Sequence, residues 1–448
     1  MSDNAGAGER AFDVLGRHLA QPIRAQRNLR RANADAVQAL SAMARTSRRG
    51  RNAARNVLVG NEPLPLRGQS ALTKALQVQL GTILHRFPRG WSKHVRELLD
   101  LGVDPNTSND RGHTILHLGA RWHDLETVNV ALEGGADPNR RDVQGQTALI
   151  LVTPQENRRG DNDQASIVQR LLKGGADPDI QDNDGNTALL LATHDSWMPL
   201  EVIDRLLDAG ADPNLQNDQG HTALTLVAKR GGGGTIMTRL LQDPRTNVNL
   251  PGVDRLPALA LAAKWGFLQR VEDLLAAGAD PNIQKGGEET ALMVSLNNRE
   301  IVTRLLAAHA NPDLKDRWGE TALMKACSTD RPEIVNLLLT AGADPNLKDR
   351  NGGTALIKAT IKWSMGSINR LLAAGANPNL KTDDGKTALM YAAADGFVAA
   401  VSKLLAAGAT PSLKLRNGTS VWTTPEIEAM IRAAVPAPRR NPKRQRQT

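Results

Sequence analysis

Short apolar runs recur along most of the chain, and polar stretches rich in glycine, proline, aspartate and asparagine separate them. One example is residues 319–351, GETALMKACSTDRPEIVNLLLTAGADPNLKDRN. A small-residue run is followed there by a turn and then by a denser apolar run. Two short helices, each with one apolar face, are the simplest structure that this pattern predicts. The predicted core of the segment consists of Ala322, Leu323, Ala326, Ile334, Val335, Leu337, Leu338 and Leu339.

Start and stop signals fit the same two helices. The hydroxyl of Thr321 is expected to cap the first helix, and Pro332 suits the first turn of the second. Gly342 is expected to end the second helix, because glycine adopts the left-handed conformation at no steric cost. Residues 344–346 then turn the chain, and residues 348–352 are predicted to form an exposed hairpin, which we call a finger.

The arrangement repeats at a nearly constant interval. The proline of the GADPN-like tail marks each repeat, and the marks are Pro105, Pro138, Pro178, Pro213, Val248, Pro281, Pro312, Pro345, Pro378 and Pro411. Successive marks are 33, 40, 35, 35, 33, 31, 33, 33 and 33 residues apart. A period near 33 residues is the signature of a stacked solenoid, in which each repeat contacts only its neighbours. Such a chain has no single globular core.

These residues resemble the ankyrin repeat family, whose unit is a finger, a helix begun by threonine, an antiparallel second helix and a Gly-Ala-Asp loop. The resemblance covers roughly residues 68–417 and implies about ten repeats in an all-α repeat solenoid. The family's Thr-Pro-Leu-His becomes Thr-Ala-Leu-x in most repeats, as at Thr147, Thr187, Thr222, Thr290, Thr321, Thr354 and Thr387. Only the Thr82–His85 and Thr114–His117 segments keep the histidine. We expect its loss to weaken each of the other repeats by ~1 kcal/mol.

Four segments follow from these boundaries. Residues 1–66 form a basic, Arg/Ala-rich segment that is expected to be partly helical or disordered. Residues 67–417 form the repeat array, and residues 418–435 a C-terminal capping repeat. A terminal repeat must cover the last apolar face, and a helix over 425–435 is expected to do so. Residues 436–448 are predicted to be a basic disordered tail.

Two places break the regular pattern. An insertion at 154–164 lengthens one repeat to 40 residues, and insertions on one face of a solenoid can act as binding loops. Four glycines, Gly231 to Gly234, stand where one helix should turn into the next, and the following repeat begins at Leu256-Pro257 without a threonine. Because repeats are coupled only to their neighbours, the junction 229–257 is predicted to be the weakest link and a candidate hinge.

Composition places further limits. The single cysteine, Cys327, excludes an intramolecular disulfide, and an aromatic content of 3% means that the core must be aliphatic. No apolar run approaches the length of a membrane span, and residues 1–20 lack the apolar block of a secretory signal. We therefore expect a soluble cytoplasmic protein, with a nuclear location as an alternative.

The net charge of +9 is concentrated at the two ends of the chain. Residues 1–60 hold 11 arginines against 4 acidic residues, and residues 432–448 hold six basic residues and no acidic one. The ends are therefore either solvated tails or a site for a polyanion, such as nucleic acid or an anionic membrane. The basic tail, which resembles a nuclear import signal, carries Arg439, Arg440, Lys443, Arg444 and Arg446.

No pattern for chemistry was found. The sequence lacks the motifs of zinc proteases, paired-cysteine metal sites, phosphate-binding loops and serine hydrolases. Cys327 occupies a small-residue position of a first helix, which predicts a buried packing thiol. The loop aspartates, predicted to bond local backbone amides, are Asp104, Asp137, Asp177, Asp212, Asp280 and Asp344. We therefore expect no catalytic residue, no metal site and no cofactor.

The tryptophans suggest a binding surface. Trp122, Trp265 and Trp363 each follow a basic residue and lie eight or nine positions after the start of a first helix, and Trp197 has a similar offset. In the ankyrin family the end of the first helix and the finger tips line the concave groove that holds partner proteins. The residues that the resemblance places there are Arg121, Trp122, Trp197, Lys264, Trp265, Arg317, Trp318, Lys362 and Trp363. The alternative is that each indole fills a gap between layers.

The resemblance implies a non-enzymatic scaffold or adaptor, expected to be monomeric, that binds a protein partner through its concave face and fingers. Two alternatives stay open. One is polyanion binding through the basic ends, and the other is a bacterial effector that acts on host proteins inside a host cell.

Overall fold

The computed structural model describes residues 92–100, 104–153, 163–194, 198–252, 255–284, 289–414, 420 and 422–434. The predictions for the N-terminal segment, for most of the 154–164 insertion, for Trp197 and for the tail beyond residue 434 lie outside these ranges. The described residues form helices and turns with no β-strand, and two isolated bridges join Pro251 to Pro257 and Lys414 to Ser420. The chain divides into two compact units, residues 1–218 and 219–448.

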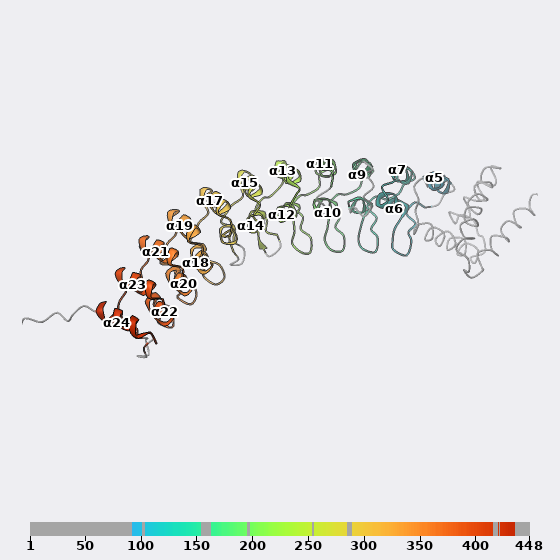
Figure 1. Ribbon diagram of the computed structural model, residues 1–448. Coiled ribbons are helices and arrows are strands. Elements are labelled where there is room, and N and C mark those ends of the chain that lie inside the picture. Colours follow the sequence, from blue (N-terminus) through green and yellow to red (C-terminus); the bar gives the residue numbers. More distant parts are fainter. Residues whose placement is uncertain are drawn as a thin grey trace, which may run out of the picture. The chain divides into compact units, whose positions relative to one another are not determined.

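Unit 1 is a stack of helical pairs (Figure 1). Its first helices pack side by side in one row and its second helices in another, with α6 against α8, α8 against α10, and α7 against α9. The first helices are α6 (Ile115–Arg121), α8 (Ala148–Val152) and α10 (Ala188–His194). The second helices are α5 (Ser92–Asp100), α7 (Leu125–Glu133), α9 (Asp163–Lys173) and α11 (Leu200–Asp208).

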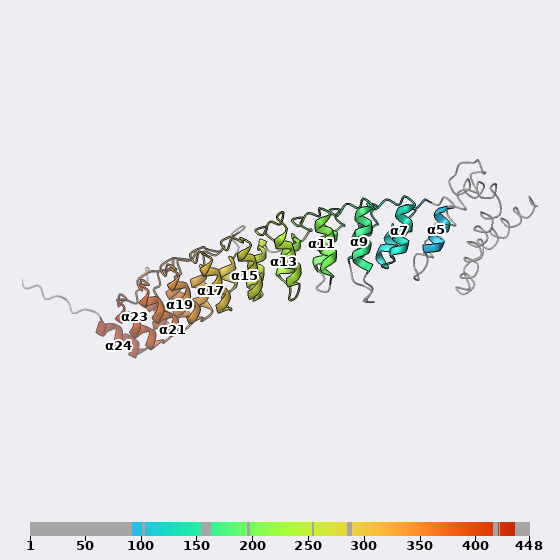
Figure 2. The same ribbon diagram turned by 90° about the horizontal axis from the view of Figure 1, so that it is seen from above.

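Unit 2 has the same two rows, and its second helices lie next to one another in Figure 2. The first helices are α12 (Ala223–Ala228), α14 (Ala258–Lys264), α16 (Ala291–Val294), α18 (Ala322–Ser328), α20 (Ala355–Ile361) and α22 (Ala388–Ala394). The second helices are α13 (Gly234–Gln242), α15 (Leu268–Ala276), α17 (Arg299–Ala307), α19 (Pro332–Thr340), α21 (Met365–Ala373) and α23 (Val398–Ala406), and α24 (Pro425–Ala434) follows them.

Threonine caps begin the first helices, as predicted. In each case the hydroxyl accepts a hydrogen bond from the backbone N–H three residues later, at 3.2 to 3.4 Å. The capping residues are Thr114, Thr147, Thr187, Thr222, Thr290, Thr321, Thr354 and Thr387. The one first helix described without its threonine, α14, begins after Pro257 and has no side-chain cap.

The core lies between the two rows of helices. Ile334, Val335 and Leu338 of α19 are buried, whereas Leu337 and Leu339 are only half-buried, because a second helix turns one side to solvent. First helices are buried more completely, since other helices of the stack flank them and small alanines allow close approach. None of the helices described is long and apolar enough to span a bilayer.

The loops after the second helices link one repeat to the next. All six predicted loop aspartates accept a backbone N–H two residues later, at 2.8 to 2.9 Å. The Asn or Asp that follows the marker position then accepts a backbone N–H from the next repeat, at 2.6 to 2.9 Å. These acceptors are Asn106, Asn139 and Asp179 in unit 1, and Asn249, Asn282, Asp313, Asn346 and Asn379 in unit 2. The sequence analysis missed this second role.

The last helix, α24, packs against α23 and buries Ile427 and Ile431. It spans almost the whole of the helix expected for the capping repeat and ends one residue early, at Ala434. An apolar stripe on a short helix thus covers the final layer of unit 2.

The glycine-rich turn before α13 is held by a buried arginine that the sequence analysis did not foresee. Arg270 of α15 is 7% exposed, and its guanidinium donates to the carbonyl oxygen of Val227 at 2.5 Å and to those of Arg230 and Gly232. It also lies 4.7 Å from the ring centroid of Phe267. Burial lowers the pKa of Arg270. The carbonyls at the negative end of α12 accept from this cation, so the predicted weak junction has a specific anchor.

Replacing this anchor should loosen the junction. Arg270→Met keeps the apolar stem but leaves several carbonyls without a donor, and we expect it to destabilise unit 2 by about 2 to 3 kcal/mol. Urea unfolding should show the loss, and hydrogen exchange should quicken at residues 229–234. The matched control is Arg304→Met, because Arg304 is exposed and pairs with Glu272 at 2.8 Å, an interaction typically contributing below about 1 kcal/mol. Equal effects of the two substitutions would contradict the assignment.

Candidate partner-binding surface

Two of the candidate tryptophans lie where the sequence placed them. Trp122 follows α6 and Trp265 follows α14, each as the residue that ends its helix, and the preceding Arg121 and Lys264 occupy the last helical turn. The side chain of Trp122 is 38% exposed and that of Trp265 is 59% exposed. A large apolar ring held in water at a helix end is available for a partner.

Trp363 lies one residue further along than its two counterparts. Lys362 ends α20, and Trp363 takes the next position, with φ at 56°. The corresponding residues elsewhere in unit 2 are Gly266, at 78°, and Gly396, at 73°. The left-handed conformation is strained for a bulky residue. The ring stacks on Phe397 of the next repeat at 4.8 Å between centroids, yet Trp363 remains 52% exposed.

Trp318 lies in a finger, beside Arg317, and is 64% exposed. Its backbone is fixed, because its N–H donates to the Asp316 carboxylate at 2.8 Å and its carbonyl accepts from the N–H of Arg350 at 3.1 Å. Trp318 therefore projects from a rigid turn.

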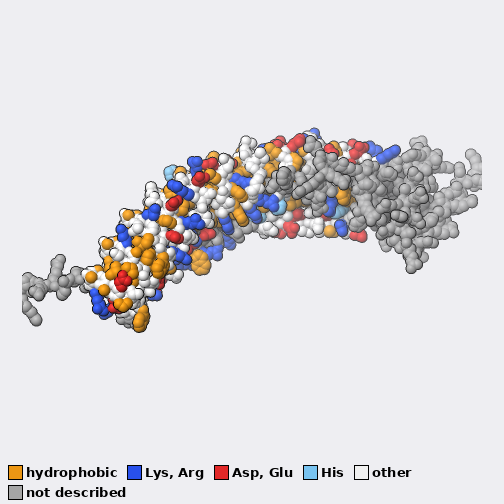
Figure 3. All heavy atoms as spheres, in the orientation of Figure 1, with side chains coloured by type: hydrophobic (Ala, Val, Ile, Leu, Met, Phe, Trp, Pro, Cys, Tyr) orange, Lys and Arg blue, Asp and Glu red, His pale blue; other side chains and the backbone are white. Residues whose placement is uncertain are grey.

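The candidates do not converge on one point. Within unit 2, Trp265 and Trp363 lie at the ends of first helices three repeats apart, and Trp318 precedes the start of another first helix. Arg121 and Trp122 belong to unit 1. Figure 3 shows basic, acidic and apolar side chains interspersed over the face that it presents. The arrangement suits an extended contact over several repeats more than a small-molecule pocket.

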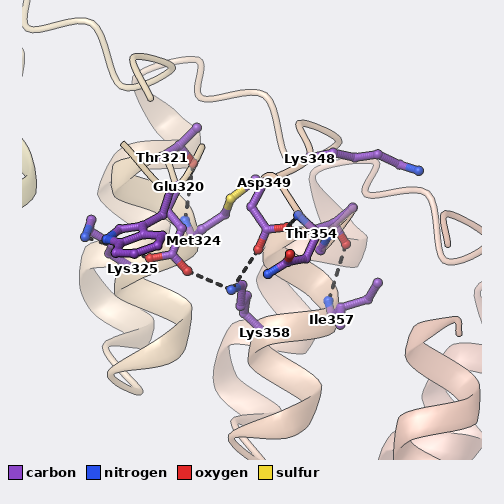
Figure 4. A network of polar contacts seen from close by, with 12 residues as sticks. Glu320, Thr321, Met324, Lys325, Lys348, Asp349, Thr354, Ile357 and Lys358 are labelled. Atoms are coloured by element: carbon purple, nitrogen blue, oxygen red, sulfur yellow. Dashed lines mark hydrogen bonds and ion pairs between the residues drawn. The ribbon is translucent and has the colours of Figure 1, made fainter. Parts of the chain in front are cut away.

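A network of ion pairs crosses the first helices of unit 2 (Figure 4). The ammonium of Lys358 lies 2.7 Å from Glu320 of the preceding repeat and 2.8 Å from Asp349 of its own. Lys325 repeats the pattern, at 2.8 Å from both Glu289 and Asp316. Each lysine thereby bridges two consecutive repeats.

The network is fully ionised. Burial disfavours the charged form of Asp349, but hydrogen bonds from Lys358 and from backbone amides prevail and lower the pKa of that carboxyl. Burial likewise opposes the charge on Lys358, and its bonds to Asp349 and Glu320 raise the pKa of the ammonium. Groups held so firmly in their charged forms serve structure rather than proton transfer.

The sequence analysis missed this network, although its signal is present in the chain. Glutamate precedes the capping threonine at Glu289 and Glu320, and lysine stands four residues after the next threonine in each case, at Lys325 and Lys358. The partners are more than 30 residues apart, so only the repeat register brings them together.

In unit 1 a histidine makes the equivalent bridge. The Nδ1 atom of His117 accepts from the Thr114 backbone N–H at 3.2 Å, and its Nε2–H donates to the Gln146 carbonyl of the next repeat at 3.1 Å. His113 stacks beside it at 6.1 Å and lies 3.1 Å from the carboxylate of Asp142. The histidine predicted to be structural is therefore confirmed in the repeat that the structure describes.

Reactive groups are otherwise buried or dispersed. Cys327 is fully buried, as predicted, and desolvation raises the pKa of its thiol, which leaves it unreactive. No group of three or more metal-binding side chains comes together among the residues that the structure covers.

Comparison with known families agrees with this architecture. A family model described as ankyrin repeats in three copies matches residues 157–251, 196–285, 259–349 and 341–415, and one for the single ankyrin repeat matches residues 111–143. Together they cover well over half of the chain. The chain belongs to the ankyrin repeat family. No curated protein matches it. Ankyrin repeats are in general protein–protein interaction modules and are typically not enzymes.

The ankyrin assignment confirms the resemblance inferred from the repeat length and from the Thr-Ala-Leu and Gly-Ala-Asp segments. It does not identify which of the exposed residues contact a partner. The candidate tryptophans and their basic neighbours remain a prediction.

The histidine bridge predicts that unit 1 loses stability in acid. Burial lowers the pKa of His117 below its usual 6.5, so below that pH the unfolded chain binds more protons than the folded one. The free energy of unfolding of unit 1 should therefore fall as the pH drops from 7.5 through 6.5. His117→Leu, which copies Leu190 at the same position of another ankyrin repeat, should flatten this slope in urea titrations. An unchanged slope would contradict the role given to His117.

The backbone at Trp363 predicts an unusual order of stability. Glycine relieves the left-handed strain and alanine does not, so Trp363→Gly should be more stable than Trp363→Ala by about 1 kcal/mol. Trp265, whose φ is −88°, provides the control, and there alanine should be the more stable replacement. Denaturant midpoints of the four variants test both orders. The idea fails if alanine is at least as stable as glycine at position 363.

Proposed function

We propose that this protein is a non-enzymatic interaction module that binds a protein partner through exposed aromatic and basic side chains on the first helices and fingers of unit 2. The proposal rests on one observation, the exposure of Trp265, Trp318 and Trp363 in an array whose other large apolar side chains are mostly buried. Each lies next to a basic residue, respectively Lys264, Arg317 and Lys362.

Physical chemistry favours such residues as anchors. Tryptophan and arginine are over-represented among the residues that dominate binding at protein interfaces, with about 2 kcal/mol or more lost on truncation. Two such anchors would supply a large part of the roughly 8 kcal/mol of a micromolar complex. The stacked ankyrin layers hold the anchors in place before binding, so little ordering is required when the partner arrives.

Affinity capture with the full chain tests the proposal. The wild-type protein should retain a partner that the triple variant Trp265→Ala, Trp318→Ala, Trp363→Ala loses. The matched control is Trp422→Ala, because Trp422 is 92% exposed but lies beside the capping helix, and we expect this variant to bind normally. Circular dichroism should show that every variant keeps its helices.

Two results would overturn the proposal. One is a partner retained equally by the triple variant, and the other is a partner lost equally by Trp422→Ala. Trp122→Ala, measured separately, tests whether unit 1 contributes to the same interaction.

A further inference from the structure

The fingers of unit 2 carry lysines at a strict interval. Lys315, Lys348, Lys381 and Lys414 are all exposed and follow one another every 33 residues, and we call this set the lysine ladder. The ammonium of Lys315 donates to the carbonyl of Lys348 at 2.8 Å, and that of Lys348 donates to the carbonyl of Lys381 at 2.7 Å. Successive members therefore lie within one side-chain length of each other, on neighbouring fingers.

Folding does not require these charges. At the same position of other repeats, Gln181 donates to the carbonyl of Gln216 at 2.9 Å, and Gln284 donates to that of Lys315 at 3.0 Å. A neutral amide thus makes the bond that the ladder lysines make. An ammonium has three donors, and after this bond the rest of its hydrogen-bonding capacity remains for a ligand.

Other basic groups strengthen the positive character of these fingers. Arg317 and Arg350 are exposed on the first two, while Asp316 and Asp349 are buried and paired with Lys325 and Lys358. Lys348 points away from that network in Figure 4. The third finger also carries Asp383 and Asp384, of which Asp384 pairs with Lys386 at 3.0 Å. Exposed positive charge therefore exceeds exposed negative charge along the ladder.

The fingers of unit 1 differ. The finger that contains Gln181 exposes Asp177 and Asp184 and has no basic residue between them. The basic row is thus a local property of unit 2 rather than a requirement of the repeat.

The pitch of the ladder selects a partner. Packed helices of neighbouring repeats are about 8 to 10 Å apart, so the ladder advances by about that distance at each step. Three residues of an extended peptide span about 10 Å. An extended segment with an acidic side chain at every third residue would place one carboxylate opposite each ladder lysine.

We propose that the lysine ladder binds an extended acidic segment of a partner protein, with acidic residues spaced by three and an apolar contact at Trp318. This inference rests on the proposed function and narrows its partner class. The chain's own ends are unsuited to the surface, because residues 1–60 and 432–448 are strongly basic.

Binding of synthetic peptides to the full chain tests the inference. The probe is a fluorescein-labelled peptide of repeated Glu-Ser-Gly, about twelve residues long so that it reaches four ladder positions. A peptide of the same composition with its glutamates clustered is the comparison. In low-salt fluorescence anisotropy the spaced peptide should bind more tightly, and added salt should remove the difference.

Matched charge variants make the test specific. The ladder variant Lys315→Gln, Lys348→Gln, Lys381→Gln should keep the wild-type unfolding midpoint, because glutamine makes the same bond at Gln181 and Gln284. It should weaken the spaced peptide roughly tenfold. The control removes the same charge from second helices, through Lys173→Gln, Arg299→Gln and Lys403→Gln, and should change affinity less than about twofold.

Three outcomes would overturn the inference. They are equal binding of the spaced and clustered peptides, equal effects of the ladder and control variants, and tighter ladder-dependent binding of single-stranded oligothymidine, which would make the row a nucleic-acid surface. A captured partner that depends on the tryptophans but not on the ladder would leave the proposed function intact. Ladder-dependent peptide binding without any tryptophan-dependent partner would do the reverse.

Discussion

Stacking of each repeat on its neighbours is the interaction on which the rest of this structure depends. A pair of helices this short cannot bury its apolar face alone, and its own hydrogen bonds are too few to hold it together in water. The core residues of α19, such as Val335 and Leu338, are buried because α17 and α21 lie on either side of that helix. Where the stack ends, α24 supplies the missing neighbour.

Polar groups reinforce the stack at three levels. Loop residues such as Asn346 accept a backbone N–H from the next repeat, and finger residues such as Gln284 donate to a carbonyl of the next finger. Between these levels, Lys358 and His117 bridge adjacent repeats by different chemistry. The position after the recurring Thr-Ala-Leu start can thus vary, because either an ion pair or a histidine bond fastens the layers.

The sequence predicted the features that depend on local chemistry. Threonine caps, the glycine that ends each second helix and the self-bonding loop aspartates all follow from residue type and short spacing, and the structure confirms them. The sequence analysis missed contacts between residues about 30 to 40 positions apart, such as Arg270 with the glycine turn and Lys358 with Glu320. Reading the sequence one repeat at a time hides these pairs, because each partner is unremarkable within its own repeat.

The candidate site shows the same limit. Sequence spacing placed Trp122 and Trp265 correctly at helix ends, but it grouped Trp363 with them although that residue occupies the left-handed position. A shift of one residue matters at a turn, since it decides which way the ring projects. Exposure and backbone conformation come only from the folded chain.

The bond between Asn346 and the backbone N–H of Asn377 has a consequence for how such an array can grow. Donor and acceptor occupy the same two positions in every pair of repeats, so duplicating or deleting one whole 33-residue segment re-forms the bond with a new neighbour and leaves no polar group unpaired. Gene duplication can therefore lengthen the protein without a folding penalty at the joint, and the uniform 33-residue steps between Pro312 and Pro411 are what recent copying of this kind would leave behind.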